Sequence, residues 1–182
     1  MKKYNIIYAD PPWKYKNYNY ATASRGQEKE YTTMSIEEIK SLPVHTLTAV
    51  DCILFLWVCF PILKESIAVI ESWGFTYKTI GFIWIKKNKH KDSFFWGMGN
   101  WTRSNAELCL IGIKGNPKRA SAAVHQLICE PIDRHSKKPG IVRDKIVTLC
   151  GDVPRMELFA RQTTEGWDVW GNEVNSIITL KS

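Results

Sequence analysis

Residues 4–13 read Tyr4-Asn5-Ile6-Ile7-Tyr8-Ala9-Asp10-Pro11-Pro12-Trp13, and this stretch decides the fold prediction. The apolar run over 4–9 has the length of a strand, and two consecutive prolines stop it because proline donates no backbone hydrogen bond and has a restricted φ. We therefore predict a buried strand over 4–9 that ends in a turn. The turn carries a carboxylate, a constrained carbonyl group and a flat aromatic ring.

Similar apolar runs recur along the chain and predict further strands at 53–58, 79–85, 107–113, 156–160 and 167–170. Helices are predicted after a capping box of Ser35 and Glu38, over 61–73 before Gly74, and over 141–150. Apolar strands separated by helices indicate a sheet that is covered on both faces. The sequence thus predicts an α/β fold with a largely parallel sheet, in one domain over residues 1–182.

Polar residues with chemical potential follow three of these strands. Residues 10–13 follow the first strand, Arg161 follows the strand at 156–160, and Gly171-Asn172-Glu173 follow the last strand. Ligands of open α/β sheets bind beyond the carboxyl ends of the strands. We therefore expect these three segments to share one site.

Composition excludes several classes of protein. The chain has 182 residues, of which 45% are hydrophobic and 24% are charged, as is usual for globular domains. Every apolar run is far shorter than the ~20 residues that span a bilayer, and no signal peptide is recognisable, so we predict a cytoplasmic protein with no membrane contact. Five cysteines without a C-x-x-C pair indicate reduced thiols, and the four histidines lack metal-ligand spacing, so no metal is expected.

Basic residues are concentrated in one third of the chain. The net charge is +7, and residues 86–143 contain 12 of the 25 lysines and arginines but only four of the 18 acidic residues. A segregated basic excess is typical of a surface that faces a polyanion such as nucleic acid. A solvated basic surface without a partner is the structural alternative.

The turn at 10–13 combines groups that could hold a planar heterocycle with an exocyclic amino group. Asp10 and the carbonyl of Pro11 could each accept one N–H of that amino group, and Pro12 restrains the backbone between them and Trp13. Trp13, or another aromatic ring nearby, could stack on the heterocycle. A structural Pro-Pro turn with a surface aspartate and a packed tryptophan is the alternative.

The same turn resembles the [DNS]-P-P-[YFW] motif of amino-methyltransferases that act on nucleic-acid bases, in the form typical of N6-adenine enzymes. Similarity extends over residues 4–174, to the family that contains the eukaryotic messenger-RNA N6-adenosine methyltransferase and its small bacterial and phage relatives. The matching blocks lie at residues 9–13, 31–35, 54–58, 73–75, 83–86, 97–101, 107–117, 136–139, 157–161 and 170–173.

The resemblance implies a Rossmann-like methyltransferase fold with a circularly permuted motif order and S-adenosylmethionine as cofactor. It implies catalytic roles for Asp10, Pro11, Pro12 and Trp13. It also implies that the cofactor is surrounded by Asp10, Lys138, Glu157, Phe159, Arg161, Asn172 and Glu173. For Glu157 and Arg161, an ion pair at the strand end is the structural alternative. The chain departs from its larger relatives after Arg161, where Gln162-Thr163-Thr164 replaces a His-Asn pair.

A base that is methylated inside a duplex must be flipped out, unless it is already single-stranded. Two loops, 17–31 and 86–103, combine aromatic rings with polar or basic side chains that could stack on bases and contact phosphates. We predict substrate contacts by Tyr31, Lys86, Lys87, Lys89, Trp101 and Arg103. Phe94, Phe95 and Trp96 could instead anchor the second loop by hydrophobic packing.

These observations predict transfer of a methyl group to N6 of adenine in DNA. The compact chain resembles the standalone bacterial and phage members, which favours DNA over RNA, and the aspartate of the turn favours adenine over N4 of cytosine. The same chemistry on RNA, or a non-catalytic nucleic-acid-binding subunit of a methyltransferase complex, are the alternatives. Nucleic acid is the predicted partner, and a homodimer is a further prediction.

Overall fold

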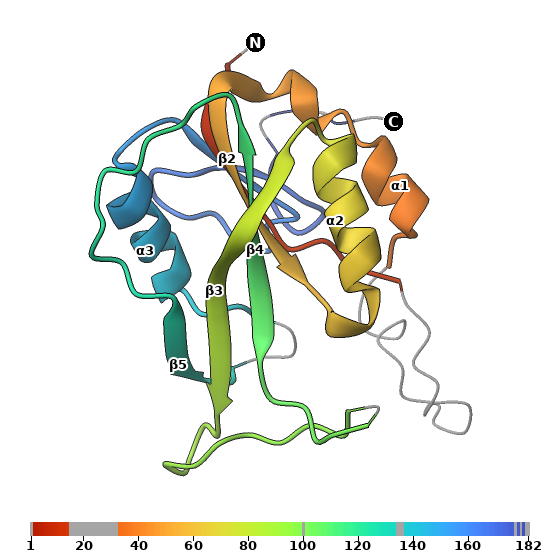
Figure 1. Cartoon of the computed structure of the whole chain (residues 1–182), viewed down its shortest axis with the longest axis vertical. Coiled ribbons are helices and arrows are strands. Elements are labelled where there is room, and N and C mark those ends of the chain that lie inside the picture. Colours follow the sequence, from red (N-terminus) through yellow and green to blue (C-terminus); the bar gives the residue numbers. More distant parts are fainter. Residues whose placement is uncertain are drawn as a thin grey trace.

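The computed structural model describes residues 2–14, 33–99, 101–133, 137–176, 178 and 180. The described chain contains three α-helices and seven strands (Figure 1). The strands are β1 Tyr4–Ala9, β2 Thr48–Val58, β3 Thr76–Lys87, β4 Glu107–Lys114, β5 Leu127–Pro131, β6 Arg155–Leu158 and β7 Asp168–Trp170; the α-helices are α1 Ile36–Ser41, α2 Leu63–Ser72 and α3 Ile141–Cys150. Short 3-10 helices lie at Val44–Thr46 and Phe60–Ile62.

The strands form one sheet in the order β5-β3-β4-β2-β1-β6-β7. β1 lies between β2 and β6 and is parallel to both, whereas β4 is antiparallel to its neighbours β2 and β3. β5 is parallel to β3, and β7 is parallel to β6. All strands except β4 therefore end at the same edge of the sheet, which includes the end of β1.

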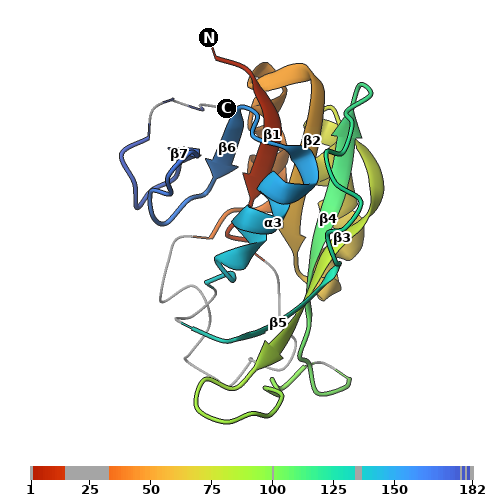
Figure 2. The same cartoon turned by 90° about the vertical axis from the view of Figure 1, so that its left-hand side faces the viewer.

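Helices cover both faces of the sheet, with α1 and α2 on one side and α3 on the other (Figures 1 and 2). On the first face, Ile7 of β1 packs in a buried cluster with Ile39 of α1 and Ile70 of α2. On the second face, Tyr8 of β1 joins a cluster that includes Ile146 of α3. Because both faces are buried there, β1 from Ile6 to Ala9 and β2 from Cys52 to Val58 are continuously apolar rather than alternating.

The α/β class and the helices on both faces are confirmed. The capping box predicted at Ser35 and Glu38 is present, and Gly74 follows α2 with a φ of 84°. Two features differ from the prediction: the sheet is mixed because β4 is antiparallel, and β5 was not predicted. The five cysteines are free; Cys129 is exposed, whereas the others are buried or partly buried.

Gly171 allows a close approach between two segments at the site edge of the sheet. A Cβ at this position would lie 2.2 Å from the carbonyl oxygen of Ala160 and 2.7 Å from its nitrogen. The backbone N–H of Ala160 donates to the carbonyl of Trp170 at 2.9 Å, on the other side of the same contact. The segment after β7 is therefore held against the segment after β6.

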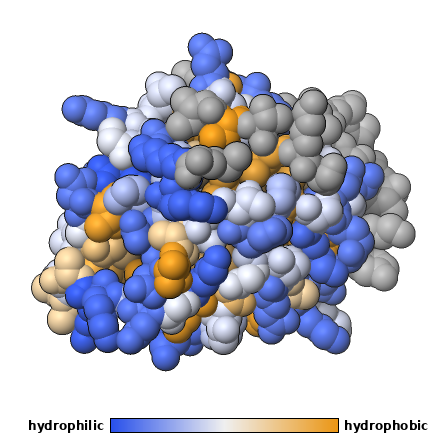
Figure 3. All heavy atoms as spheres, turned by 90° about the horizontal axis from the view of Figure 1, so that it is seen from above, coloured by the Kyte–Doolittle hydropathy of each residue, from blue (hydrophilic) through white to orange (hydrophobic). Residues whose placement is uncertain are grey.

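The described surface seen from above in Figure 3 is largely hydrophilic, with smaller hydrophobic areas between the polar side chains. Scattered apolar side chains of this kind are normal on a protein surface. Among the described residues, none of the helices has the length and hydrophobicity needed to cross a bilayer.

Candidate active site

A cavity of about 160 Å³ lies where β1 and β6 end. Six of the seven residues predicted to surround a cofactor line it: Asp10, Lys138, Glu157, Phe159, Arg161 and Glu173. The seventh, Asn172, is exposed next to Glu173. The fold thus brings residues from four segments together, as expected for the carboxyl edge of the sheet.

Asp10 begins a chain of ion pairs across this edge. Its Oδ2 atom accepts a hydrogen bond from Lys138 Nζ at 2.9 Å, and the same Nζ lies 3.3 Å from Oε2 of Glu107. Glu107 Oε1 in turn lies 2.6 Å from Lys86 Nζ. The four side chains come from the ends of β1, β3 and β4 and from the segment before α3, so the pairs tie four parts of the chain together.

These contacts control the protonation of the groups. Burial raises the pKa of the Asp10 carboxyl, and the Lys138 ammonium opposes that shift. Burial also disfavours the charged form of Lys138, but the carboxylates of Asp10 and Glu107 outweigh it and raise the pKa of the ammonium. For Glu107 burial is outweighed by Lys138 and Lys86, which hold its pKa below the usual value. Among the charged neighbours of Asp10, Lys138 thus has the largest effect in favour of the ionised carboxylate.

The turn after Asp10 is ordered by backbone hydrogen bonds. The carbonyl of Pro11 accepts from the N–H of Trp13 at 2.9 Å, and the carbonyl of Pro12 accepts from Met34 at 2.8 Å. Trp13 is buried, and its indole N–H donates to the carbonyl of Trp57 at 3.0 Å. Trp13 therefore packs beneath the turn, as the structural alternative describes, while the Pro11 oxygen keeps one lone pair for a second donor.

Glu157 makes an ion pair, but its partner is Arg143 of α3 rather than Arg161. Arg143 donates from Nε and Nη2 to the two carboxylate oxygens at 2.7 and 2.6 Å. Burial raises the pKa of Glu157, and Arg143 opposes the shift. The guanidinium carbon of Arg143 lies 5.5 Å from the ring centroid of Tyr8, so the pair is also held against an aromatic face.

Arg161 pairs with Glu173 across the contact that Gly171 allows, with Nε 3.1 Å from Oε1. Phe159, between β6 and Arg161, has a φ of 61°, an uncommon value for a residue other than glycine and one that often marks functional sites. Its ring meets that of Trp170 edge to face, with the centroids 5.3 Å apart. The wall made by the ends of β6 and β7 is therefore well defined.

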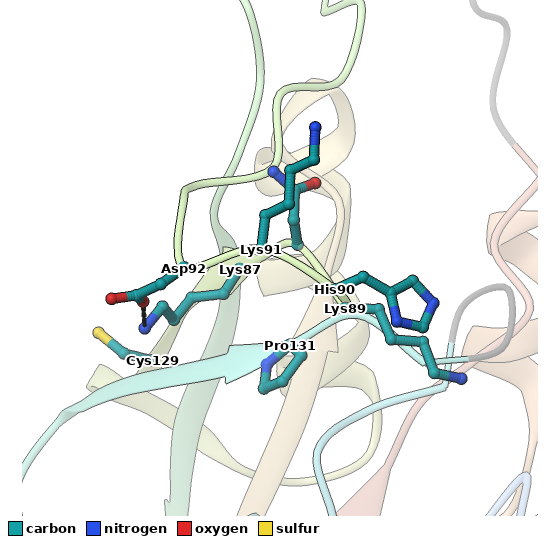
Figure 4. Close-up of a pocket in the computed structure, with 8 residues that line it drawn as sticks. Lys87, Lys89, His90, Lys91, Asp92, Cys129 and Pro131 are labelled. Carbon is teal, nitrogen blue, oxygen red and sulfur yellow. Dashed lines mark ion pairs between the residues drawn. The ribbon is translucent and has the colours of Figure 1, made fainter.

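The basic residues predicted to contact substrate divide into two groups. Lys86 is mostly buried on Glu107, whereas Lys87 is the last residue of β3 and Lys89 lies on the loop that follows it. This loop borders a surface hollow of about 390 Å³, in which Lys87 pairs with Asp92 while Lys89 and Lys91 point away from that pair (Figure 4).

Aromatic residues of the same loop are exposed. Trp101 is fully exposed, and Phe94 and Trp96 are 50% and 55% exposed, so neither Phe94 nor Trp96 is a buried anchor, whereas Phe95 between them is partly buried. Arg103 donates to the carbonyl oxygens of Gly97 and Trp96 at 2.8 and 3.1 Å, which braces the loop. The predicted contact Tyr31, and most of the loop at 17–31, lie outside the described residues.

Four cavity residues were not predicted: Tyr8, Lys137, Arg143 and Gln162. Glu107, which does not line the cavity but pairs with Lys138, was also not singled out, although it begins a matching sequence block.

The cavity presents both signs of charge, with carboxylates of Asp10, Glu157 and Glu173 and cations of Lys137, Lys138, Arg143 and Arg161. Such a lining suits a ligand that carries cationic and anionic groups. Among the described residues, no cluster of histidine, cysteine and carboxylate side chains is arranged to hold a metal ion.

Comparison with known proteins shows the family. The MT-A70 family model matches residues 4–173. The type II methyltransferase M.MunI of Mycoplasma sp is 37% identical over 190 residues, which cover 95% of this chain and 78% of that protein.

Two further relatives are named N(6)-adenosine-methyltransferases. An MT-A70-like protein of Arabidopsis thaliana is 30% identical over 178 residues, and the catalytic subunit METTL3 of Homo sapiens is 27% identical over 184 residues. The matches cover 96% and 99% of this chain but only 24% and 30% of those relatives. Because the family model spans nearly the whole chain and M.MunI matches most of it, the chain belongs to the MT-A70 family and is a methyltransferase.

Proposed function

We propose that the protein transfers a methyl group from S-adenosylmethionine to N6 of adenine in DNA, with Asp10 and the Pro11 carbonyl as acceptors for the amino group. One observation carries the proposal: Asp10 lines a cavity of mixed charge and begins the Asp-Pro-Pro-Trp turn at the end of β1. The family membership makes methyl transfer the reaction, and the turn supplies the two acceptors that an exocyclic amine needs.

The cavity fits part of such a cofactor. S-adenosylmethionine carries a sulfonium, an ammonium and a carboxylate group, and the lining offers carboxylates for the first two and lysine or arginine for the third. Its volume of about 160 Å³ is smaller than the roughly 300–1,000 Å³ of common ligand pockets, so it accommodates one end of the molecule. We assign this end to the charged methionine portion, and the ribose to Asn172 and Glu173 beyond it.

The bound cofactor supplies an electrophilic methyl group. Transfer is a direct displacement, so the protein must hold the amine nitrogen in line with that methyl group, and alignment alone can contribute ~7–11 kcal/mol to catalysis in good cases. The Asp10 carboxylate and the Pro11 carbonyl each accept one N–H, which orients the nitrogen lone pair toward the methyl. Lys138 favours the charged form of Asp10 for this task. The proton that the nitrogen loses is acidic after methylation, so Asp10 need not be a strong base.

The loop after β3 is the proposed path of the polynucleotide. Lys87, Lys89 and Lys91 would neutralise phosphates, and the exposed rings of Trp96 and Trp101 would stack on bases. A basic hollow at the same edge of the sheet as Asp10 supports this assignment. DNA is preferred to RNA because the type II methyltransferase matches at higher identity, and over more of its own length, than the N(6)-adenosine-methyltransferases do.

The sheet order supports the proposed Rossmann-like fold with permuted motifs. The strand with the catalytic turn comes first in the chain, and its neighbour β6, which borders the cofactor cavity, comes near the end. The homodimer and the cytoplasmic location stay predictions from the sequence.

The test is incubation of the protein with methyl-labelled S-adenosylmethionine and DNA and RNA oligonucleotides of matched sequence. We expect label in DNA above RNA. Label in RNA alone would show that RNA, and not DNA, is the substrate. Cofactor binding with no transfer to either polymer would favour the non-catalytic subunit.

A further inference from the structure

Arg143 of α3 is a cavity residue to which the function proposed above gives no task. We infer that Arg143 is a positioning residue for cofactor binding: held between the ring of Tyr8 and the carboxylate of Glu157, it orients Glu157 in the cavity. The inference rests on the proposed cofactor role of the cavity. On this inference, the pair of Arg143 and Glu157 decides how strongly the cationic end of S-adenosylmethionine is bound.

The geometry fixes Glu157 in three steps. Both carboxylate oxygens of Glu157 accept hydrogen bonds from Arg143, at 2.7 and 2.6 Å, so rotation of the carboxylate is restricted. Arg143 lies with its guanidinium carbon 5.5 Å from the centroid of the Tyr8 ring. The Tyr8 hydroxyl oxygen accepts a hydrogen bond from the indole N–H of Trp57 at 2.8 Å, which holds the ring in place.

Because the Arg143–Glu157 pair is buried, ligand binding explains it better than stabilisation of the fold does. The side chains of Arg143 and Glu157 are only 12% and 8% exposed. Removing two charges from water is unfavourable, and apolar replacements of buried ion pairs are often neutral or stabilising. A pair kept at the wall of a charged cavity is therefore explained better by the ligand than by the fold. Arg143 also opposes the effect of burial on the pKa of Glu157, and so favours the charged carboxylate.

Arg155 of β6 provides a matched control. Its side chain is likewise 12% exposed, its guanidinium lies 5.7 Å from the ring centroid of Trp167, and Nη1 lies 2.5 Å from Oδ1 of Asp152. Asp152, however, is 86% exposed, and neither Arg155 nor Asp152 is among the described residues that line the cavity. Loss of Arg155 thus reproduces the loss of a buried, ring-stacked arginine without touching the proposed cofactor site.

The test measures S-adenosylmethionine affinity by calorimetry, together with the melting temperature, for the parent and for Arg143→Met, Glu157→Gln, the double variant and Arg155→Met. We expect each single change at the pair to weaken binding about tenfold or more, since charge-assisted hydrogen bonds are removed. The double variant should melt closer to the parent than either single variant, because no buried charge is left alone, yet its affinity should stay low. Arg143→Lys should recover only part of the affinity because it lacks the fork.

The possible failures are distinguishable. A parent that binds no S-adenosylmethionine contradicts the proposed function itself. A parent that binds, with Arg143→Met within about twofold of it, contradicts the role of Arg143 alone. Recovery of both melting temperature and affinity in the double variant would make the pair purely structural. An equal loss of affinity in Arg155→Met would show a general effect of removing a buried arginine. If Arg143→Met does not fold, the melting temperature and affinity of the double variant decide whether the pair is functional or purely structural.

Discussion

Lys138 Nζ lies 2.9 Å from Oδ2 of Asp10, although 128 positions separate the two residues in the chain. The contact joins the segment before α3 to the turn after β1, and it places a cation against the carboxylate that the proposed reaction needs. Lys138 also lies 5.5 Å from the centroid of the Trp57 ring, so the ammonium has an aromatic wall on one side. This arrangement makes the charge of Asp10 depend on Lys138.

Replacing Lys138 should therefore change the pH dependence of the reaction. Burial raises the pKa of Asp10 and Lys138 opposes that rise, so Lys138→Met should raise the pKa further. Because Asp10 acts as the carboxylate, activity is present above its pKa and is lost as the pH falls through it. The acid limb of the rate profile at saturating cofactor should move to higher pH in Lys138→Met. Lys138→Arg keeps the positive charge and should leave the acid limb near its original position. An acid limb at the same pH in the parent and in Lys138→Met would contradict the effect of Lys138 on Asp10.

Removal of the Asp10 carboxylate should slow transfer strongly without unfolding the protein. Glu107 still pairs with Lys138 at 3.3 Å, so Asp10→Ala leaves no buried ammonium without a partner. Loss of one of two acceptors for the amine should slow transfer by roughly 10²–10³, by analogy with loss of one oxyanion-hole donor. Single-turnover rates and melting curves measure both effects. Transfer within about tenfold of the parent would remove Asp10 from its assigned role.

The ribose assignment predicts a different kinetic effect for Asn172. Contacts to the ribose are equal in the ground state and the transition state, so Asn172→Ala should raise the cofactor KM with little change in kcat at saturation. Gly171→Ala should act in the same direction, since its Cβ would meet the backbone of Ala160 and displace the segment. Cofactor titrations of the initial rate separate the two parameters. A loss in kcat with unchanged affinity would refute the placement of Asn172.

The basic loop should control polynucleotide binding rather than cofactor binding. Replacing Lys87, Lys89 and Lys91 with glutamine should reduce the logarithmic salt slope of binding by about 0.7–0.9 for each phosphate that the loop no longer neutralises. The matched control replaces Lys2, Lys3 and Lys78, which carry the same charge but lie at the starting ends of β1 and β3. Polynucleotide affinity at several salt concentrations is the readout. Equal salt slopes of polynucleotide binding for the two triple variants would show that the loop is a solvated basic surface without a role in binding.

The sequence predicted local structure better than partners in space. The strand at residues 4–9 and the cap at Ser35 depend on neighbouring residues, and both are present. The direction of β4 could also have been predicted, because a parallel partner of β3 needs a crossover helix and no helical pattern lies between them. β5 was missed because its apolar run, Leu127-Ile128-Cys129, has only three residues and is followed by Glu130 and Pro131.

The cavity shows the same division. The residues at strand ends could be placed at one edge because the fold class requires it. The ion-pair partner of Glu157 could not be predicted from the sequence, because Arg143 and Arg161 have the same chemistry. Only the packing of α3 on Tyr8 brings Arg143, rather than Arg161, to Glu157. Trp13 likewise could face the ligand or the core as far as its neighbours in sequence are concerned, and burial against Trp57 requires the complete sheet.

Whether the protein methylates N6 of adenine can be read from the nucleosides of DNA treated with the protein and S-adenosylmethionine. Hydrolysis followed by chromatography and mass spectrometry distinguishes N6-methyladenine from N4-methylcytosine, and Asp10→Ala serves as the matched control. We expect N6-methyladenine in DNA treated with the parent protein, and far less after the same time with the variant. Methylated cytosine as the product, or no methylated base from a parent protein that binds the cofactor, would contradict it.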